Sequence, residues 1–358
     1  MECNKINSFQ IASAYIGVTI GAGFASGQEV LQFFSFFGPL SLAAIAMTSF
    51  LFAFFAIVIL RLGSKLSATS HREVVYRSGG RAVGLAVDIT ITFFLFGSFT
   101  AMLAGTGASL NQQFGLPPLY GSLFMAAVAL ATVLTGLSGI ISALSLLVPV
   151  MFAGIMTLAG AVLIYFPDGL AEMRYYAQPW EAVIPFWPLS ALTYVSYNLV
   201  VAVAILAPMG SMAGSGSSIE KGSVAGGIGL GLGITAINLV LLAVPESFGY
   251  PVPMSYVAGL FSPLAGALYT LILTAAIYST AVGGLYGFTA RIASPEKHRF
   301  KLLAAAVTLG GLIASAIGFT NLVRFLYAGV GIAGFLLLGG LAYQYLRSKL
   351  RPGPFPSA

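Results

Sequence analysis

The sequence predicts an all-α integral membrane protein with about ten transmembrane helices. Of its 358 residues, 58% are hydrophobic and only 7% are charged, whereas soluble domains carry about 25% charged residues. Apolar runs of about 20 residues, the length of helix that spans a bilayer, recur along the whole chain. The single cysteine, Cys3, excludes an internal disulfide and a cysteine metal cluster. We therefore expect one transmembrane domain over residues 1–358.

The apolar runs define the expected helices and their order. Glycine and proline mark the tight junctions between some of them, as at Phe37-Gly38-Pro39. The first run follows Lys5 and continues into a glycine-rich stretch without a cleavage region, so no cleaved signal peptide is expected. The expected spans are 8–37, 38–62, 81–112, 117–136, 140–164, 182–210, 222–245, 263–291, 300–318 and 320–346.

Basic residues fall almost entirely on one side of this ten-span arrangement. Of the 16 Lys and Arg, only two lie elsewhere: Arg174 in a connection on the other side, and Arg324 inside the last span. The positive-inside rule makes the basic side cytoplasmic. Both termini are then expected in the cytoplasm, with the chain in the cell membrane. The opposite side carries acidic and aromatic residues: Asp168, Glu172, Glu181, Glu246, Tyr175, Tyr176, Trp180 and Trp187.

The first span is interrupted between Thr19 and Glu29. This stretch holds Gly21, Gly23 and Gly27 within an otherwise apolar run, and each glycine in a helix costs about 1 kcal/mol relative to alanine. Open backbone at membrane depth is tolerated only where protein buries it or where it lines a water-filled cavity. A broken helix of this kind is typical of the substrate site of a transporter.

Ten spans divide into two sets of five, which predicts an internal repeat of residues 8–164 and 182–346. The polar cluster Tyr194–Asn198 lies at about the same depth in the sixth span as the glycine break does in the first. Because five is odd, the second half would enter from the opposite side, and the repeat would be inverted. Paired interruptions in the two halves indicate a binding site at the membrane midplane. The alternative is that these Tyr and Asn side chains only join packed helices by hydrogen bonds.

The residues Ile20-Gly21-Ala22-Gly23-Phe24 resemble the glycine motif in the first helix of the amino acid–polyamine–organocation (APC) superfamily, which has the LeuT fold. More specifically, Gly21 to Glu29 resembles the YkvI-like amino acid permeases. The resemblance implies a 5+5 inverted repeat in which the first and sixth helices are both broken. It also implies a substrate-binding site formed by Gly21, Ala22, Gly23 and Phe24 through their backbone, the Ser26 hydroxyl, and Tyr194, Tyr197 and Asn198 from the sixth span.

Phe24 is expected either to cover the substrate as a hydrophobic lid or to serve in ordinary helix packing.

Ser279 and Thr280 lie near the middle of the eighth span, where sodium-coupled members of this fold bind their ion. Span 140–164 lacks the lysine found in some proton-coupled relatives, so sodium is favoured over protons as the coupling ion. Alternatively, the two hydroxyls bond only to carbonyls of their own helix.

Three ionisable residues lie well inside the spans, where each is costly. Glu29 and Arg324 are expected to form an outer gate, with Glu29 as a substrate-amine ligand or a proton carrier being the alternative. Asp88 is expected to be a proton relay, an inner anchor, or simply the partner of a nearby basic residue. His71 and His298 are expected in loops, without carboxylate partners and without a metal site.

These features favour a secondary active transporter, a symporter of a small zwitterion such as an amino acid, coupled to sodium or protons. The alternatives are a ligand-sensing receptor subunit of the same fold, or a transporter of a nucleobase or an amine. No arrangement typical of an enzyme is found, and no catalytic residue is assigned. No cofactor is expected apart from a sodium ion, and no nucleic acid or obligate protein partner beyond the substrate, the ion and the bilayer.

Overall fold

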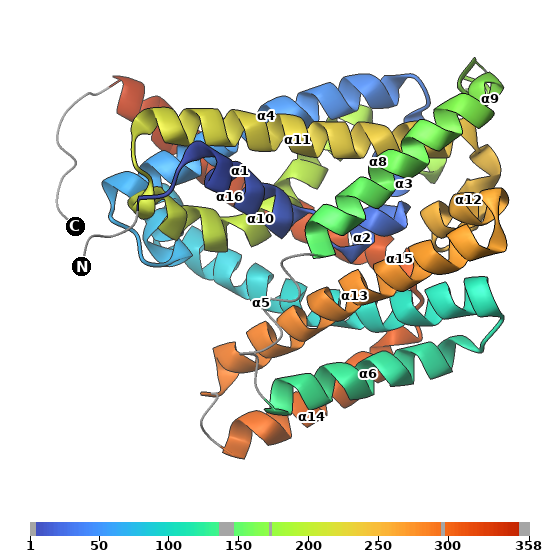
Figure 1. Cartoon of the computed structure of the whole chain (residues 1–358). Coiled ribbons are helices and arrows are strands. Elements are labelled where there is room, and N and C mark those ends of the chain that lie inside the picture. The colour runs from blue at the N-terminus through green and yellow to red at the C-terminus, as the bar shows by residue number, and fades with distance from the viewer. Residues whose placement is uncertain (1–4, 136–146, 172–173, 295–297, 351–358) are drawn as a thin grey trace.

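The computed structural model describes residues 5–135, 147–171, 174–294 and 298–350, and these are almost entirely helical (Figure 1). Seven of the described helices are long and apolar enough to cross a membrane. The only β-type pairing in the described ranges is an isolated bridge between Ile6 and Ala213. The expectation of an all-α membrane protein is confirmed.

The first span is a chain of short segments. Helix α1 (Ser8–Thr19) is followed by α2 (Ala22–Ser26), α3 (Gln28–Phe33) and the 3₁₀ turn η1 (Ser35–Phe37). The backbone leaves the helical conformation at Ile20 and Gly21 and again at Gly27, which has a φ of 84°. The predicted interruption is therefore present, with a second break one helical turn later.

The other spans follow the predicted order. The long helices are α4 (Leu40–Lys65), α5 (His71–Phe114), α6 (Pro118–Thr135), α8 (Leu147–Tyr165), α10 (Trp187–Met212), α11 (Gly216–Ala243), α13 (Pro263–Ile292), α14 (His298–Ser315), and α15 (Phe319–Leu322) leading through the π-helical segment η4 (Val323–Tyr327) into α16 (Ala328–Leu350). Short helices in the connections are α9 (Pro167–Ala171), η2 (Pro179–Glu181), η3 (Pro245–Gly249) and α12 (Pro253–Phe261). The predicted junction between spans 117–136 and 140–164 lies outside the described residues.

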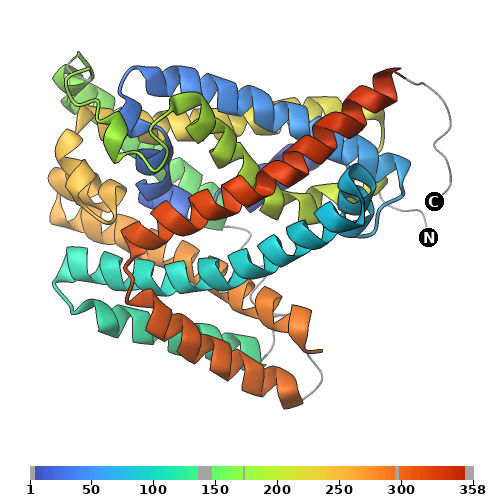
Figure 2. The ribbon, with the colours of Figure 1, turned by 180° about the vertical axis from the view of Figure 1, so that it is seen from behind.

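The helices form two groups that meet around α2 and α3. Helices α1, α4, α10 and α11 pack together, and α5, α6, α13 and α14 form a second group (Figures 1 and 2). Helix α16 crosses α5 and α10 and so connects the two groups (Figure 2). The start of α1 and the end of α16 lie at the same end of the bundle, called here the basic end (Figure 1).

The sixth span differs from the expectation. Helix α10 runs from Trp187 to Met212 without a break, and a proline, Pro208, is accommodated near its end. The polar cluster keeps helical geometry because it contains no glycine or proline, and the Asn198 amide donates to the Tyr194 carbonyl at 2.9 Å within the helix. Only the first of the two predicted helix breaks is therefore present.

The third span also begins earlier than predicted. Ser70 and Glu73 form a capping box, in which each side chain bonds to the backbone of the other residue and starts α5 at His71. The helix then kinks at Gly80, which has a φ of 74°. His71 is consequently the first residue of a helix and not part of a loop.

Small residues allow α4 and α10 to pack with their backbones in close contact. A methyl group at Gly63 would overlap the Ala207 carbonyl, and one at Gly210 would overlap the Leu60 carbonyl. In membranes, such small-residue contacts supply the packing that the hydrophobic effect cannot provide between helices.

We predict that Gly210→Ala destabilises the protein by about 1–3 kcal/mol, because the added methyl collides with backbone that cannot move aside. The control is Gly339→Ala in α16, where a Cβ has open space within 4 Å and alanine has the higher helix propensity. Thermal unfolding in detergent measures both. Equal melting temperatures for the two variants would contradict the proposed close packing.

Candidate functional site

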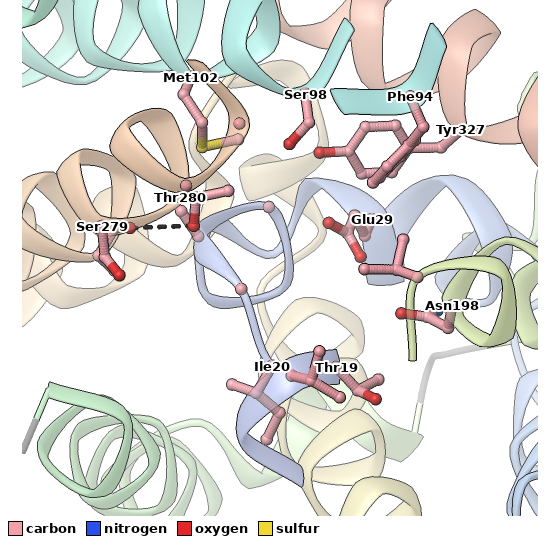
Figure 3. Close-up of a pocket in the computed structure, with 18 of the residues that line it drawn as sticks. Thr19, Ile20, Glu29, Phe94, Ser98, Met102, Asn198, Ser279, Thr280 and Tyr327 are labelled. Atoms are coloured by element: carbon pink, nitrogen blue, oxygen red, sulfur yellow. Dashed lines mark hydrogen bonds between the residues drawn. The ribbon is translucent and has the colours of Figure 1, made fainter. Parts of the chain in front are cut away.

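A cavity of about 260 Å³ lies at the break of the first span (Figure 3). Residues 17–23 and Glu29 form one wall, α10 contributes Tyr197 and Asn198, and α5 and α13 form the far side. The cavity is slightly smaller than a typical drug-sized site of about 300–1,000 Å³. Among the described residues, no Lys, Arg or His lines it.

Three carbonyls at the end of α2 are bonded by nearby groups. The Ser26 hydroxyl donates to the Gly23 carbonyl at 2.6 Å, the Gly27 amide donates to the Phe24 carbonyl, and the Tyr269 hydroxyl of α13 donates to the Ala25 carbonyl at 2.7 Å. The opposite end of α2 begins at Ala22, and its first amides have no intrahelical acceptor, as at any helix start. The free polar groups of the break are thus at the cavity side.

Glu29 belongs to the cavity and not to an outer gate. Because Gly27 is left-handed, α3 starts in a new direction, and the Glu29 side chain folds back against Gly23. There it accepts a hydrogen bond from the Tyr197 hydroxyl, and the residue is 5% exposed. Within the described part of the chain, no Lys or Arg forms an ion pair with this carboxylate.

The predicted gate is not formed in this structure. The Arg324 guanidinium lies 5.9 Å from the ring centroid of Phe325, a neighbour that is itself exposed. The sequence placed Arg324 one turn into a regular helix, but the chain there is the π-helical segment η4. The structure therefore does not bring Glu29 and Arg324 together, and it favours the alternative roles of Glu29.

Three aromatic rings form a wall of the cavity beside Glu29. The centroids of Tyr197 and Tyr327 are 5.1 Å apart, those of Phe94 and Tyr327 are 5.5 Å apart, and those of Phe94 and Tyr197 are 6.3 Å apart. Tyr327 is the last residue of η4, and π-helical turns occur often at functional sites. Sequence reasoning missed Phe94 and Tyr327, because no local pattern distinguishes them from other membrane aromatics.

Hydroxyl side chains from α13 and from the end of α1 also line the cavity. Ser279 and Thr280 of α13 line the cavity together with Thr19 and Gly21 (Figure 3). The Thr280 hydroxyl donates to the Ala276 carbonyl at 3.1 Å, as the structural alternative expected, which leaves its lone pairs available. Thr19 Oγ1 is buried without a hydrogen-bond partner among the described groups.

Of the remaining predicted substrate residues, four line the cavity and three do not. Gly21, Ala22, Gly23 and Asn198 are in its wall, and the Asn198 oxygen points toward it (Figure 3). The Phe24 ring is fully buried and lies against Gly233 of α11, so Phe24 packs between helices and is not a lid. The Ser26 hydroxyl caps α2, as described above. Tyr194 is fully buried in a ring cluster with Phe33 and Phe34.

Burial along the first span is asymmetric. Residues 22–38 are all buried, whereas α1 includes exposed and half-exposed positions up to Val18. Beyond Glu29, the ring centroids of Phe34 and Tyr194 are 4.9 Å apart, and the Ser190 hydroxyl donates to the Phe33 carbonyl at 2.8 Å. The cavity is thus closed on the α3 side, and its lining extends on the α1 side to Gly17 and Val18.

Asp88 lies away from this cavity, within a cluster of basic residues at the basic end. Its carboxylate is 2.9 Å from His71 Nε2, 3.2 Å from Arg72 Nε and 3.7 Å from an Arg291 nitrogen. The expectation that His71 has no carboxylate partner was wrong, because the early start of α5 places both residues on one helix. Asp88 is a partner of basic residues and holds α5 to α13.

No family model matches the chain, but individual proteins do. It is 28% identical to the Bacillus subtilis membrane protein YkvI over 341 residues, which cover 95% of this chain and 97% of YkvI. It is 30% identical to Bacillus subtilis YyaD over 344 residues, which cover 93% of this chain and 96% of YyaD.

Several solved transporters share its fold. MhsT in complex with L-phenylalanine gives a TM-score of 0.58 at 17% identity, covering 91% of this chain and 87% of MhsT. A Na⁺-coupled sialic acid symporter gives 0.62 at 12% identity, covering 94% and 79%. The inward-facing conformation of Mhp1 gives 0.65 at 15% identity, covering 97% and 78%. The chain is therefore a LeuT-fold membrane protein that belongs to the family of YkvI and YyaD.

Proposed function

We propose that the chain is a secondary active transporter of a small organic solute that carries a protonated amine, in the simplest case an amino acid. The observation that carries the proposal is the position of Glu29: a buried carboxylate in the wall of the cavity, at the break of the first helix, without a basic partner in the described structure. The Na⁺-coupled and amino-acid-bound transporters that share its fold support the same class of function.

Charge balance is the argument for a cationic ligand group. A buried charge is costly unless it is both paired and hydrogen-bonded, and the Tyr197 hydroxyl supplies only a single neutral bond. Glu29 therefore needs a proton or a ligand cation whenever the cavity is closed to water. The rings of Phe94, Tyr197 and Tyr327 beside it would further favour a cation through their faces.

The free amides at the start of α2 would hold the other end of a zwitterion. Helix starts favour anions because their amide dipoles point outward, and Ala22 and Gly23 lie in the cavity wall. An amino acid would then place its carboxylate at these amides and its amine at Glu29. Asn198 would offer its side-chain oxygen to the same amine.

Sodium is the coupling ion that we propose. The hydroxyls of Thr19, Ser279 and Thr280 are hard oxygen ligands, and no lysine or arginine lines the cavity to compete with a cation. A proton carried by Glu29 is the alternative.

With the basic end in the cytoplasm, as the positive-inside rule requires, the asymmetric burial corresponds to a cavity that faces the cytoplasm. Alternating access would then require α3 to separate from α10.

The first experiment measures the thermal stability of the purified protein against amino acids, amines and nucleobases, in sodium and in choline buffer. A ligand at about 100 times its Kd stabilises a folded protein by about 2.7 kcal/mol. We expect an amine-bearing ligand to give a shift that requires sodium, and to move across proteoliposome membranes. Binding without flux would indicate a sensor, and a shift given only by uncharged nucleobases would contradict the proposed role of Glu29.

We predict that Glu29→Gln weakens binding of the amine-bearing ligand at least about tenfold, since a charged hydrogen bond contributes about 1.5–3 kcal/mol. The matched control is Glu220→Gln, which removes an exposed carboxylate paired with Arg61 at the basic end. Binding titrations with the amine-bearing ligand measure the affinity of both variants. Unchanged affinity in Glu29→Gln would remove Glu29 from the site.

We predict that Gly23→Ala abolishes transport while the protein still folds. The added methyl would overlap the Glu29 carboxylate, which is the flexible end of a side chain and can move aside. The control is Gly154→Ala in α8, where nothing lies within 4 Å of the new Cβ. Flux in proteoliposomes, normalised to folded protein, should be lost only in Gly23→Ala; normal flux would show that Glu29 can leave its position without consequence.

We predict that Thr280→Ala loses the sodium dependence of ligand binding. Thr289→Ala is the matched control, because Thr289 makes the same type of bond within α13, to the Leu285 carbonyl at 2.7 Å, but lies outside the cavity. Sodium titrations of the ligand-induced thermal shift compare them. Equal sodium dependence in both variants would remove Thr280 from the sodium site.

A further inference from the structure

A second cavity, of about 890 Å³, lies at the basic end between the start of α5 and the end of α13. It shares no lining residue with the first cavity. Its wall has two distinct parts, one polar and charged, the other apolar. Neither part is explained by the proposed transport site.

The polar part carries more positive than negative charge. His71, Arg72 and Arg291 all face a single carboxylate, that of Asp88. The Arg72 side chain is 67% exposed and makes one contact with Asp88, at 3.2 Å, so most of its five N–H donors are available. The nearby acid Glu73 is occupied by the capping bonds to Ser70 and Thr69 and does not line the cavity.

Arg291 is held rigidly in this wall. Its guanidinium donates to the Asp88 carbonyl at 3.0 Å and to the Thr92 hydroxyl at 2.8 Å. The Tyr76 hydroxyl lies 3.4 Å from the Asp88 carboxylate and completes the polar group. These bonds position the Arg291 guanidinium in advance, so an incoming anion would not have to order it.

The apolar part of the wall continues directly from these charges. Leu85, Ile89, Phe93 and Ile292 line the cavity and are each between 56% and 60% exposed. Helices α5 and α13 are both long and apolar enough to span the membrane, and we infer that these exposed apolar side chains face the hydrocarbon of the bilayer. A single molecule that fills both parts must have an anionic head and an alkyl chain.

We propose that this cavity binds an anionic phospholipid from the leaflet at the basic end. Its phosphate would sit at Arg72 and Arg291, where charge-assisted bonds are strongest, and an acyl chain would lie along Ile89 and Phe93. Basic pockets between membrane helices are known to hold such headgroups. A free phosphate ion would use only the polar part and would leave the apolar wall uncovered. The site is independent of the proposed transport function.

The test measures thermal stability of delipidated protein in detergent against three added probes: phosphatidylglycerol, phosphatidylcholine and inorganic phosphate. We expect stabilisation by phosphatidylglycerol at concentrations where the other two have no effect. Equal shifts with phosphatidylcholine would overturn the headgroup assignment. A shift with inorganic phosphate equal to that with phosphatidylglycerol would overturn the lipid assignment.

Arg72→Gln tests the residue assignment without disturbing the core, because Arg72 is largely exposed. We expect it to raise the phosphatidylglycerol concentration for half of the shift about tenfold, as for one charged hydrogen bond, and Arg72→Lys to restore part of it. Arg81→Gln, on the same helix but outside the cavity, is the control and should match the parent. Identical titrations for Arg72→Gln and Arg81→Gln would refute the site.

Discussion

The structure depends on one constraint: the backbone of a helix opened inside a membrane must be bonded by the protein around it or must line a cavity that admits water or a ligand. At the carbonyl end of α2, Ser26 and Tyr269 meet this requirement, and the Gly27 amide closes the last turn. The opposite end of the same short helix is left facing the cavity. Because Tyr269 belongs to α13, the break is also fixed to the second helix group, and the position of the site follows from it.

The left-handed conformation of Gly27 places the charged group of the site, the Glu29 carboxylate. In a straight helix Glu29 would lie two turns beyond Gly23 and point away from it, whereas a φ of 84° turns α3 and brings the carboxylate back beside Gly23. A side chain at position 27 would strain this conformation and would also meet Met254 of α12. The bond between Glu29 and Tyr197, and the position of the carboxylate beside the aromatic wall, thus depend on one backbone turn.

The spans and the first break could be predicted because they are local properties of the sequence: hydropathy gives the helices, and three glycines give the interruption. The continuous α10 could not be foreseen from the Tyr194–Asn198 cluster, because a polar side chain that bonds to a carbonyl of its own helix, as Asn198 does, need not break the helix. Phe24 and Tyr194, expected to bind substrate, do not line the cavity for a related reason: the direction of a side chain depends on packing partners that are distant in the sequence. His71 pairs with Asp88 because α5 begins at His71, and the hydropathy pattern does not reveal this early helix start.

The contacts around the break indicate which parts could move. Helix α2 is attached to α13 by Tyr269, and α3 is attached to the start of α10 by Ser190 and by the rings of Phe33 and Tyr194. The connection before α10 adds backbone bonds from Gln178 to Phe36 and from Val183 to Gln32. Helix α1 is attached to α4 by the Tyr15 hydroxyl, which donates to the Phe52 carbonyl at 3.2 Å, and it joins α2 through the non-helical Ile20 and Gly21. Opening the closed side must therefore break the α3–α10 contacts together, whereas the α1 side can adjust at a two-residue hinge.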